Sequence, residues 1–129
     1  MNENQIANTV VDVAFHLHSA LGPGLLESVY QELMVYKLRE RGLFIETEVD
    51  LPLIFEGKKF SSLYRIDVLV EKKVIIELKS VENLLPVHKK QLLTYLRLTD
   101  LRLGILINFG SVLIKDGIKR IVNGLEENK

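Results

Sequence analysis

Two short apolar segments in the middle of the chain dominate its pattern of hydrophobic and polar positions. Residues 66–70 and 74–78 are rich in β-branched side chains and are separated by three polar residues. Their length and composition predict two strands of a buried sheet joined in a hairpin. Because side chains alternate between faces along a strand, a three-residue loop sets Asp67 directly opposite Glu77. A two-residue loop would place the two acids on opposite faces of the sheet.

The remaining pattern predicts helices and strands arranged as in an α/β domain. Apolar residues recur at spacings of three and four in 3–21, 25–41 and 87–98, which is typical of amphipathic helices. Further strands are expected at 44–55, with Pro52 marking an edge or a bulge, at 103–108 and, more briefly, at 112–114. Asp116 is expected to begin a last helix that runs to about Gly124. The strand at 103–108 follows a helix, so it should run parallel to 75–79 in a mixed central sheet flanked by helices.

The size and composition of the chain fit one folded unit, residues 1–129. The chain is 47% hydrophobic and 26% charged, and no Pro/Ser-rich linker or repeat divides it. No apolar stretch approaches ~18 residues and no basic leader is seen, so we expect neither membrane insertion nor export, and a cytoplasmic location. The absence of cysteine excludes disulfides and thiolate metal sites. A formal net charge of zero argues against strong nonspecific binding to nucleic acid.

Asp67 and Glu77 are the first candidates for chemistry. In the three-residue register their Cβ atoms lie roughly 5 Å apart, where like charges destabilise a sheet. Lys79, two residues further on, offers one positive charge against two negative ones. One interpretation is an ordinary solvated face of a hairpin, on which mixed charges are common. The other is a divalent cation site, since carboxylate oxygens on two rigid strands suit Mg²⁺ or Mn²⁺.

Two of the expected helices carry further polar candidates. Glu27 lies in the first turn of the second helix, and Tyr30 follows three residues later. The helix dipole alone explains an acid there, and a tyrosine can pack its ring in the core while its hydroxyl contacts a polar cluster. On the helix at 87–98, His88, Gln91 and Tyr95 share one face. That face is either the solvent-exposed side of the helix or a polar surface that packs above Asp67 and Glu77.

The order of Asp67, then Glu77-x-Lys79 on the next strand, resembles the PD-(D/E)XK nuclease superfamily. The resemblance extends from about residue 13 to residue 122, through the segments LGPGLLESVY, YRIDVLV, VIIELKSV, HKKQLLTYL and LGILINFG. It implies a restriction-endonuclease-like α/β core with a mixed central sheet flanked by helices, formed by residues 1–129 as a single nuclease-like domain. Ile66 stands where the proline that names the superfamily is expected, a position that varies among relatives of this kind.

Two helical motifs strengthen the resemblance. Residues 24–30, GLLESVY, match the motif after which the GxxExxY family of this superfamily is named, with Gly24, Glu27 and Tyr30 at the named positions. Gln91 and Tyr95 resemble the Gln-x-x-x-Tyr helix of RecB-like exonucleases, whose side chains help to orient the catalytic strands and the DNA.

The resemblance implies a phosphodiesterase that uses Mg²⁺ or Mn²⁺. Asp67, Glu77 and the backbone carbonyl of Leu78 would bind the metal, and Glu27 would join them through water or orient the other ligands. Lys79 would hold or activate the attacking water and offset charge in the transition state.

Five further residues are expected to contact or support the nucleic acid. They are Gln91, Tyr95, Arg65, Tyr30 and His88. Arg65 shares the face of Asp67 by the alternation of the strand, and from there it can contact phosphate.

The resemblance therefore predicts a small metal-dependent nuclease that acts on DNA, with RNA left open as a substrate. The alternative is a noncatalytic nucleic-acid-binding or regulatory module that keeps the fold, because small size and balanced charge leave little surface for gripping a duplex. A homodimer that completes the DNA groove is a third hypothesis, and no membrane partner is expected.

Overall fold

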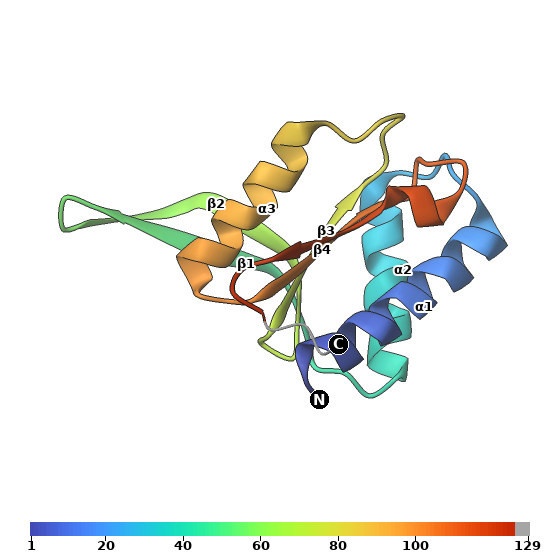
Figure 1. Cartoon of the computed structure of the whole chain (residues 1–129), viewed down its shortest axis with the longest axis horizontal. Helices are drawn as coiled ribbons and strands as arrows, with labels where there is room; N and C mark the ends of the chain where they lie inside the picture. The colour runs from blue at the N-terminus through green and yellow to red at the C-terminus, as the bar shows by residue number, and fades with distance from the viewer. Residues whose placement is uncertain (126–129) are drawn as a thin grey trace.

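Residues 1–125 of the computed structural model form a five-stranded mixed sheet with helices against both faces (Figure 1). The elements follow one another as α1 (Glu3–Leu21), α2 (Glu27–Glu40), β1 (Ile45–Phe55), β2 (Lys58–Val70), β3 (Val74–Lys79), α3 (Pro86–Thr99), β4 (Leu103–Asn108), the 3-10 helix η1 (Ile114–Gly117) and β5 (Ile118–Val122). The strands lie in the sheet in chain order. β3 and β4 run parallel, and the other neighbouring pairs run antiparallel. The expected α/β fold is therefore confirmed, including the parallel pair formed by the strand at 103–108.

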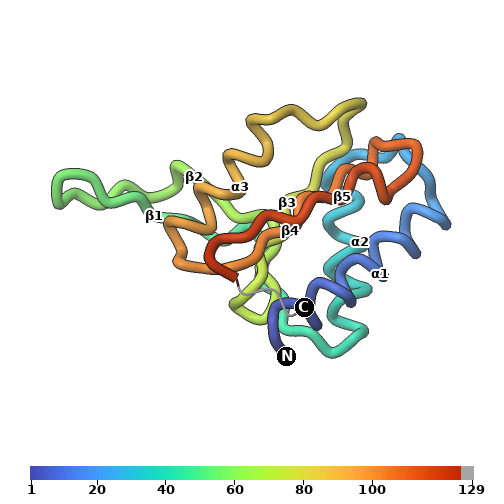
Figure 2. The backbone as a smooth tube through the Cα atoms, viewed as in Figure 1, coloured from blue at the N-terminus to red at the C-terminus, as the bar shows by residue number. Residues whose placement is uncertain are grey.

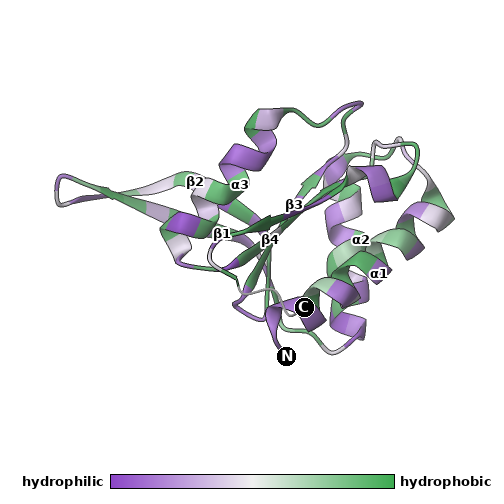
Figure 3. Cartoon of the chain, viewed as in Figure 1, coloured by the Kyte–Doolittle hydropathy of each residue, from purple (hydrophilic) through white to green (hydrophobic). Residues whose placement is uncertain are grey.

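Two apolar clusters fill the space between the sheet and its helices. Helices α1 and α2 cover one face, over Ile76 and Leu78, and α3 covers the other, over Ile75 and Leu106. Figure 2 shows the same separation, with α1 and α2 on one side of the strands and α3 on the other. β3 and β4 are buried on both faces, and apolar residues predominate along both strands (Figure 3). Within residues 1–125, no helix combines the length and apolarity that a membrane span requires.

The β2–β3 hairpin has the three-residue loop on which the site depends. Val70 pairs with Val74 directly across that loop. The next pair, Leu69 and Ile75, packs under α3. Glu77, two residues beyond Ile75, shares that face of β3 by the alternation of the strand. The three-residue register is therefore confirmed, and the acid on β3 lies on the same face as α3.

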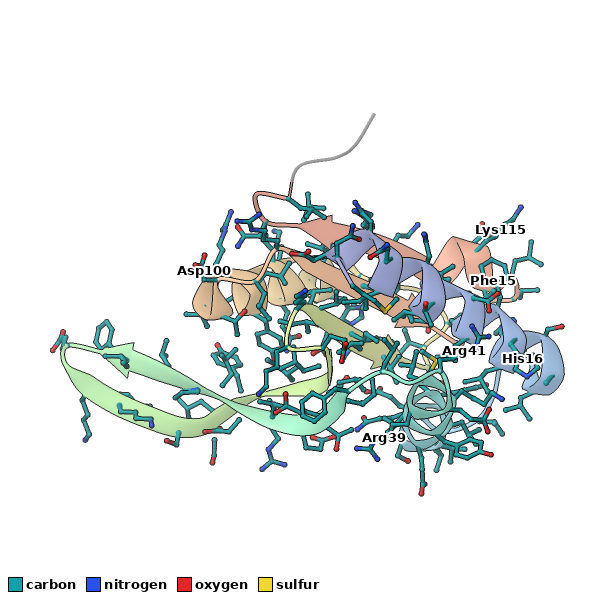
Figure 4. All side chains as sticks on the ribbon, turned by 90° about the horizontal axis from the view of Figure 1, so that it is seen from below. Phe15, His16, Arg39, Arg41, Asp100 and Lys115 are labelled. Carbon is teal, nitrogen blue, oxygen red and sulfur yellow. The ribbon has the colours of Figure 1, made fainter. Side chains whose placement is uncertain are left out.

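β1 and β2 continue past the body of the molecule as a two-stranded arm (Figures 1 and 4). The register of the pair shifts between Leu51 and Leu53, around Pro52, and β1 is an edge strand of the sheet. On β2, Ser62 takes a φ of 65° and donates its N–H to Asp50 Oδ1 at 2.7 Å. The proline thus marks both an edge strand and an irregularity in pairing, as expected.

The C-terminal segment differs from the expectation. The strand expected at 112–114 is absent, because Ile114 already begins η1, and β5 follows in place of the helix predicted from Asp116. β5 pairs with β4, and its Ile118 packs in the cluster under α1 and α2, whereas Ile121 packs in the cluster under α3. Residues three apart share a side of a helix but take opposite faces of a strand. This spacing therefore serves a strand that buries apolar side chains on both faces.

Candidate active site

The two acids lie where β2 and β3 separate. The main-chain pairing of these strands ends at Val68 and Ile76. Beyond that point, Leu78 donates its N–H to Asp67 Oδ2 at 3.2 Å, so a side chain takes the place of a main-chain acceptor. The carboxyl groups of Asp67 and Glu77 contact each other across this fork. The register thus brings the predicted acids together.

Burial makes this pair of acids difficult to ionise. Glu77 is only 6% exposed, and burial, followed by the charge of Asp67, raises its pKa to about 9. Burial also raises the pKa of Asp67, although the N–H of Leu78 and the charge of Lys79 oppose the rise. Glu77 Oε1 is buried and has no hydrogen-bond partner among the residues that the structure describes. The pair is therefore short of positive charge, and half-buried Lys79 supplies only part of it.

A hydrogen-bonded turn between α1 and α2 sets the start of α2 beside this fork. The Tyr30 hydroxyl donates to the Gly22 carbonyl at 2.5 Å and accepts the N–H of Leu25 at 3.2 Å. The Ser80 hydroxyl, just after β3, donates to the Leu25 carbonyl at 2.7 Å. These bonds hold the first turn of α2, and with it Glu27, next to the end of β3.

The predicted Gly24…Tyr30 motif therefore has a structural basis. Gly24 takes a φ of 113°, a conformation that favours glycine. The Tyr30 ring is fully buried and stacks on Phe109, with ring centroids 4.2 Å apart. Tyr30 thus supports the turn from within the core, and its burial keeps it out of contact with a nucleic acid.

Glu27 lies within the electrostatic field of the acid pair. Partial burial of its carboxyl group raises its pKa, Lys79 opposes the rise, and the charges of Asp67 and Glu48 add to it. However, no three acid or histidine side chains within residues 1–125 are grouped closely enough to hold a metal together. The position of Glu27 therefore suits an action through water or through its charge better than direct ligation.

Helix α3 places Gln91 and Tyr95 over the acids. Gln91 Nε2 donates to the Tyr95 hydroxyl at 2.7 Å, and the Tyr95 ring is almost fully buried. Burial raises the pKa of Tyr95, the Gln91 hydrogen bond lowers it, and the charges of Glu77 and Asp67 raise it further. The polar stripe on this helix is therefore more than a solvated face, because Tyr95 is near enough to sense both carboxylates.

Two other predicted supporting residues have different surroundings. His88 Nδ1 accepts the N–H of Leu85 at 3.0 Å, so the imidazole caps the start of α3. Arg65 is exposed. Ile66 packs under α3 together with Leu69, three residues later, which shows that the alternation of β2 is interrupted between them. Regular alternation therefore no longer places Arg65 on the face of the acids.

Gln31 and Glu48 join the site although the sequence pattern does not single them out. Gln31 Nε2 donates to Glu48 Oε1 at 3.0 Å and to the Asp67 carbonyl at 3.4 Å. Gln31 lies four residues after Glu27 on α2, so helical spacing is the signal that identifies it. Glu48 has a φ of 51° and reaches the site only through the pairing of β1 with β2. No local pattern indicates it.

The donor set at the fork fits a divalent cation. Asp67, Glu77 and the carbonyl of Leu78 offer oxygen atoms, which are the ligands that Mg²⁺ and Mn²⁺ prefer. The test of this fit is the buried Oε1 of Glu77, which has no donor among the described residues. A cation would supply a partner for that atom, and it would offset the burial and the charge of Asp67 that raise the pKa of Glu77.

Comparison with known proteins agrees with this geometry. No curated protein sequence matches the chain. The crystal structure of SSO0001 is similar, with a TM-score of 0.58 and 26% identity over 78% of this chain and 52% of that one, so the chain spans about half the length of that protein. A family model described as the PD-(D/E)XK nuclease superfamily matches residues 4–121. The narrower resemblance to the GxxExxY family stays a prediction. The chain belongs to the PD-(D/E)XK nuclease superfamily.

Proposed function

We propose that the chain is a nuclease that depends on Mg²⁺ or Mn²⁺ and hydrolyses phosphodiester bonds of DNA. The observation that carries this proposal is the buried Glu77 carboxyl group, whose Oε1 lacks a hydrogen-bond partner among the described residues while Asp67 lies against it. Burying a charge is costly unless it is paired or coordinates a metal. Membership of a nuclease superfamily supports the same reading.

Asp67, Glu77 and the Leu78 carbonyl are the groups that would hold the ion. When bound, the ion would polarise the scissile phosphate and lower the pKa of a coordinated water. Glu27 would orient water at the edge of the site, since its carboxyl group shares the field of Lys79 and Asp67 and, within the described part of the chain, joins no metal-holding group of three acids. Gln31 would keep the main chain of Asp67 in place through its bond to the Asp67 carbonyl.

Lys79 is the residue that would stabilise the negative charge that develops on the phosphate. In the reaction, one water and one phosphodiester become a phosphomonoester and an alcohol: a new P–O bond forms to the water oxygen, and the P–O bond to the leaving sugar oxygen breaks. The ammonium group of Lys79 would offset negative charge on the phosphate oxygens and hold the attacking water. Tyr95, fixed by Gln91, would close the α3 side of the site.

Metal binding is the first test, because it does not depend on the choice of substrate. Calorimetric titration with Mn²⁺ should show binding to the wild-type chain and loss of that binding in Glu77→Ala. Asp116→Asn, at an exposed acid of η1, is the matched control and should bind as wild type does. Absence of binding to the wild-type chain would favour a noncatalytic module that keeps the fold.

Cleavage is the second test. Purified protein with Mg²⁺ or Mn²⁺ should cut at least one of linear, circular, single-stranded or branched DNA. Asp67→Asn should reduce that rate at least about 100-fold, because the charge stabilisation expected from a bound metal is worth several kcal/mol. If Asp67→Asn cuts as fast as wild type while Asp116→Asn is also unchanged, the active-site assignment is wrong.

A further inference from the structure

A groove between α3 and β2 opens next to the acid pair. Its volume is about 320 Å³, and it is lined by Tyr64, Val87, Lys90, Gln91, Thr94 and Tyr95. Tyr95 connects the groove to the site, since it lines the groove and its hydroxyl senses the charges of Glu77 and Asp67. A chain of nucleotides lying in this groove would therefore lead directly to the acids.

Charge distinguishes this groove from the one on the other side of the site. Helix α3 carries Lys89, Lys90 and Arg97 and no acid along its length. The second groove, about 460 Å³ between α2 and β1, is lined by two acids, Glu32 and Glu48, and one cation, Arg39, so acids outnumber cations there. Phosphates are attracted to the first groove and repelled by acids in the second. The charge pattern thus assigns the approach of a nucleic acid to the α3 side.

Tyr64 gives this groove an aromatic surface at the base of the arm. Its ring meets the ring of Tyr95 edge to face, with centroids 5.6 Å apart and an angle of 64° between the planes. The Tyr95 ring is buried and fixed by Gln91, whereas Tyr64 remains 38% exposed. A half-exposed aromatic ring beside a lysine is the combination that binds single-stranded nucleic acids, in which bases stack on aromatic side chains and phosphates pair with cations.

We infer that this groove binds a single strand of nucleic acid, with a base stacked on Tyr64 and a phosphate beside Lys90. A base can stack on a side chain only when it is free of its duplex neighbours, so the groove selects unpaired over paired substrate. The inference rests on the proposed function and gives that function a substrate form and a direction of approach. Neither Tyr64 nor Lys90 belongs to the proposed metal-binding residues.

Binding without cleavage tests this inference. Fluorescence anisotropy with a labelled oligo-dT of about 12 nucleotides is measured on the full chain in EDTA, where metal-dependent cleavage cannot proceed. Tyr64→Ala should weaken binding about tenfold, and Tyr64→Phe should remain within about twofold of wild type, because the phenyl ring keeps the stacking surface. Lys90→Ala should lower the slope of log Kd against log salt by about 0.7, as expected for one lost phosphate contact to a single strand.

Two surface variants serve as controls. Lys115 lines a separate cavity with Phe15 of α1, at the end of the molecule away from the arm (Figure 4). Lys115→Ala should leave both affinity and salt slope unchanged. Tyr36→Ala, at an exposed tyrosine that lines the α2 groove, should also bind as wild type does. Thermal unfolding of each variant checks that it is folded, and Lys90→Ala tests the groove even if Tyr64→Ala does not fold.

The outcomes separate this inference from the proposed function. Equal binding by Tyr64→Ala and wild type, an equal loss in Lys115→Ala and Lys90→Ala, or a matched duplex that binds as tightly as the single strand would each overturn the groove assignment. A chain that binds oligo-dT through Tyr64 and Lys90 but cuts no DNA with Mn²⁺ retains the groove and loses the nuclease. A chain that cuts DNA while both variants bind normally retains the nuclease and loses the groove.

Discussion

The two faces of β3 differ although they belong to the same six residues. Toward α1 and α2 the strand presents Val74, Ile76 and Leu78, all fully buried. Toward α3 it presents Ile75, which is equally buried, and then Glu77, a nearly buried acid. The first face is built for packing alone. The second begins as core and becomes a polar site within two residues.

This difference indicates that packing on the apolar face of β3 compensates for the cost of the buried acid on its polar face. An acid on a central strand whose oxygen lacks a partner within residues 1–125 destabilises the fold, and its raised pKa measures that cost. The cluster under α1 and α2 holds β3 in place from the other side, so the strand does not depend on Glu77 for its position. Local violations of packing rules of this kind are expected at functional sites.

The largest expected effect on stability comes from substituting one residue on each face of β3 and comparing the two variants. Ile76→Ala should lower the free energy of unfolding by about 2–5 kcal/mol, because it leaves a cavity in the larger cluster. Glu77→Gln, one residue away, should leave stability unchanged or raise it, because the amide keeps the shape of the protonated carboxyl group and needs no proton on folding. Urea denaturation in EDTA measures both. A loss in Glu77→Gln as large as that in Ile76→Ala would show that the acid holds the strand in place.

The next effect is a pH dependence that only the polar face produces. The pKa of Glu77 is raised from its ordinary 4.5 to about 9, so the folded metal-free chain keeps a proton that the unfolded chain releases between these values. Stability should therefore fall as pH rises through this window, by up to about 1.4 kcal/mol per pH unit. Urea denaturation at a series of pH values measures the slope.

Glu77→Gln is the matched variant for this pH series. It should remove most of the slope, and Asp116→Asn should keep it. Saturating Mn²⁺ should oppose the loss at high pH, because the cation favours the ionised carboxylate. A wild-type slope that survives in Glu77→Gln would assign the titration to another group.

Local periodicity predicts most of the fold because short-range packing decides it. α1 and β4 begin and end at the expected residues, and the β-branched runs at 66–70 and 74–78 pair in the expected register. β5 was not predictable in this way, because it exists through its pairing with β4, and the spacing of Ile118 and Ile121 also fits a helix. Whether Ile118 and Ile121 pack on one side or on opposite sides depends on the two apolar clusters, and these form only in the folded chain.

The site shows the same contrast between residues that local spacing predicts and residues that only long-range pairing brings together. The juxtaposition of Asp67 and Glu77 follows from the loop length, and Glu27 is reached through a motif with local spacing. Glu48 and Tyr64, in contrast, are placed by the pairing of β1 with β2, which brings Tyr64 against Tyr95, and the alternation of β2 is interrupted just before the two acids meet. Contacts between distant strands carry this information, so it cannot be read from one segment at a time.

The smallest expected effect concerns Tyr30, where the packed face and the polar face meet. Tyr30→Phe keeps the ring stacked on Phe109 but removes the hydroxyl that holds Gly22 and Leu25. Stability should fall by about 1–2 kcal/mol, since the N–H of Leu25 loses its acceptor. Mn²⁺ affinity and cleavage should fall by about threefold, because the freed turn no longer fixes Glu27 near Lys79. Tyr36→Phe, on the exposed side of the same helix, is the control and should change neither. If Tyr30→Phe lowers stability while Mn²⁺ affinity and cleavage stay at wild-type levels, the motif serves packing alone, and the two faces of β3 are independent.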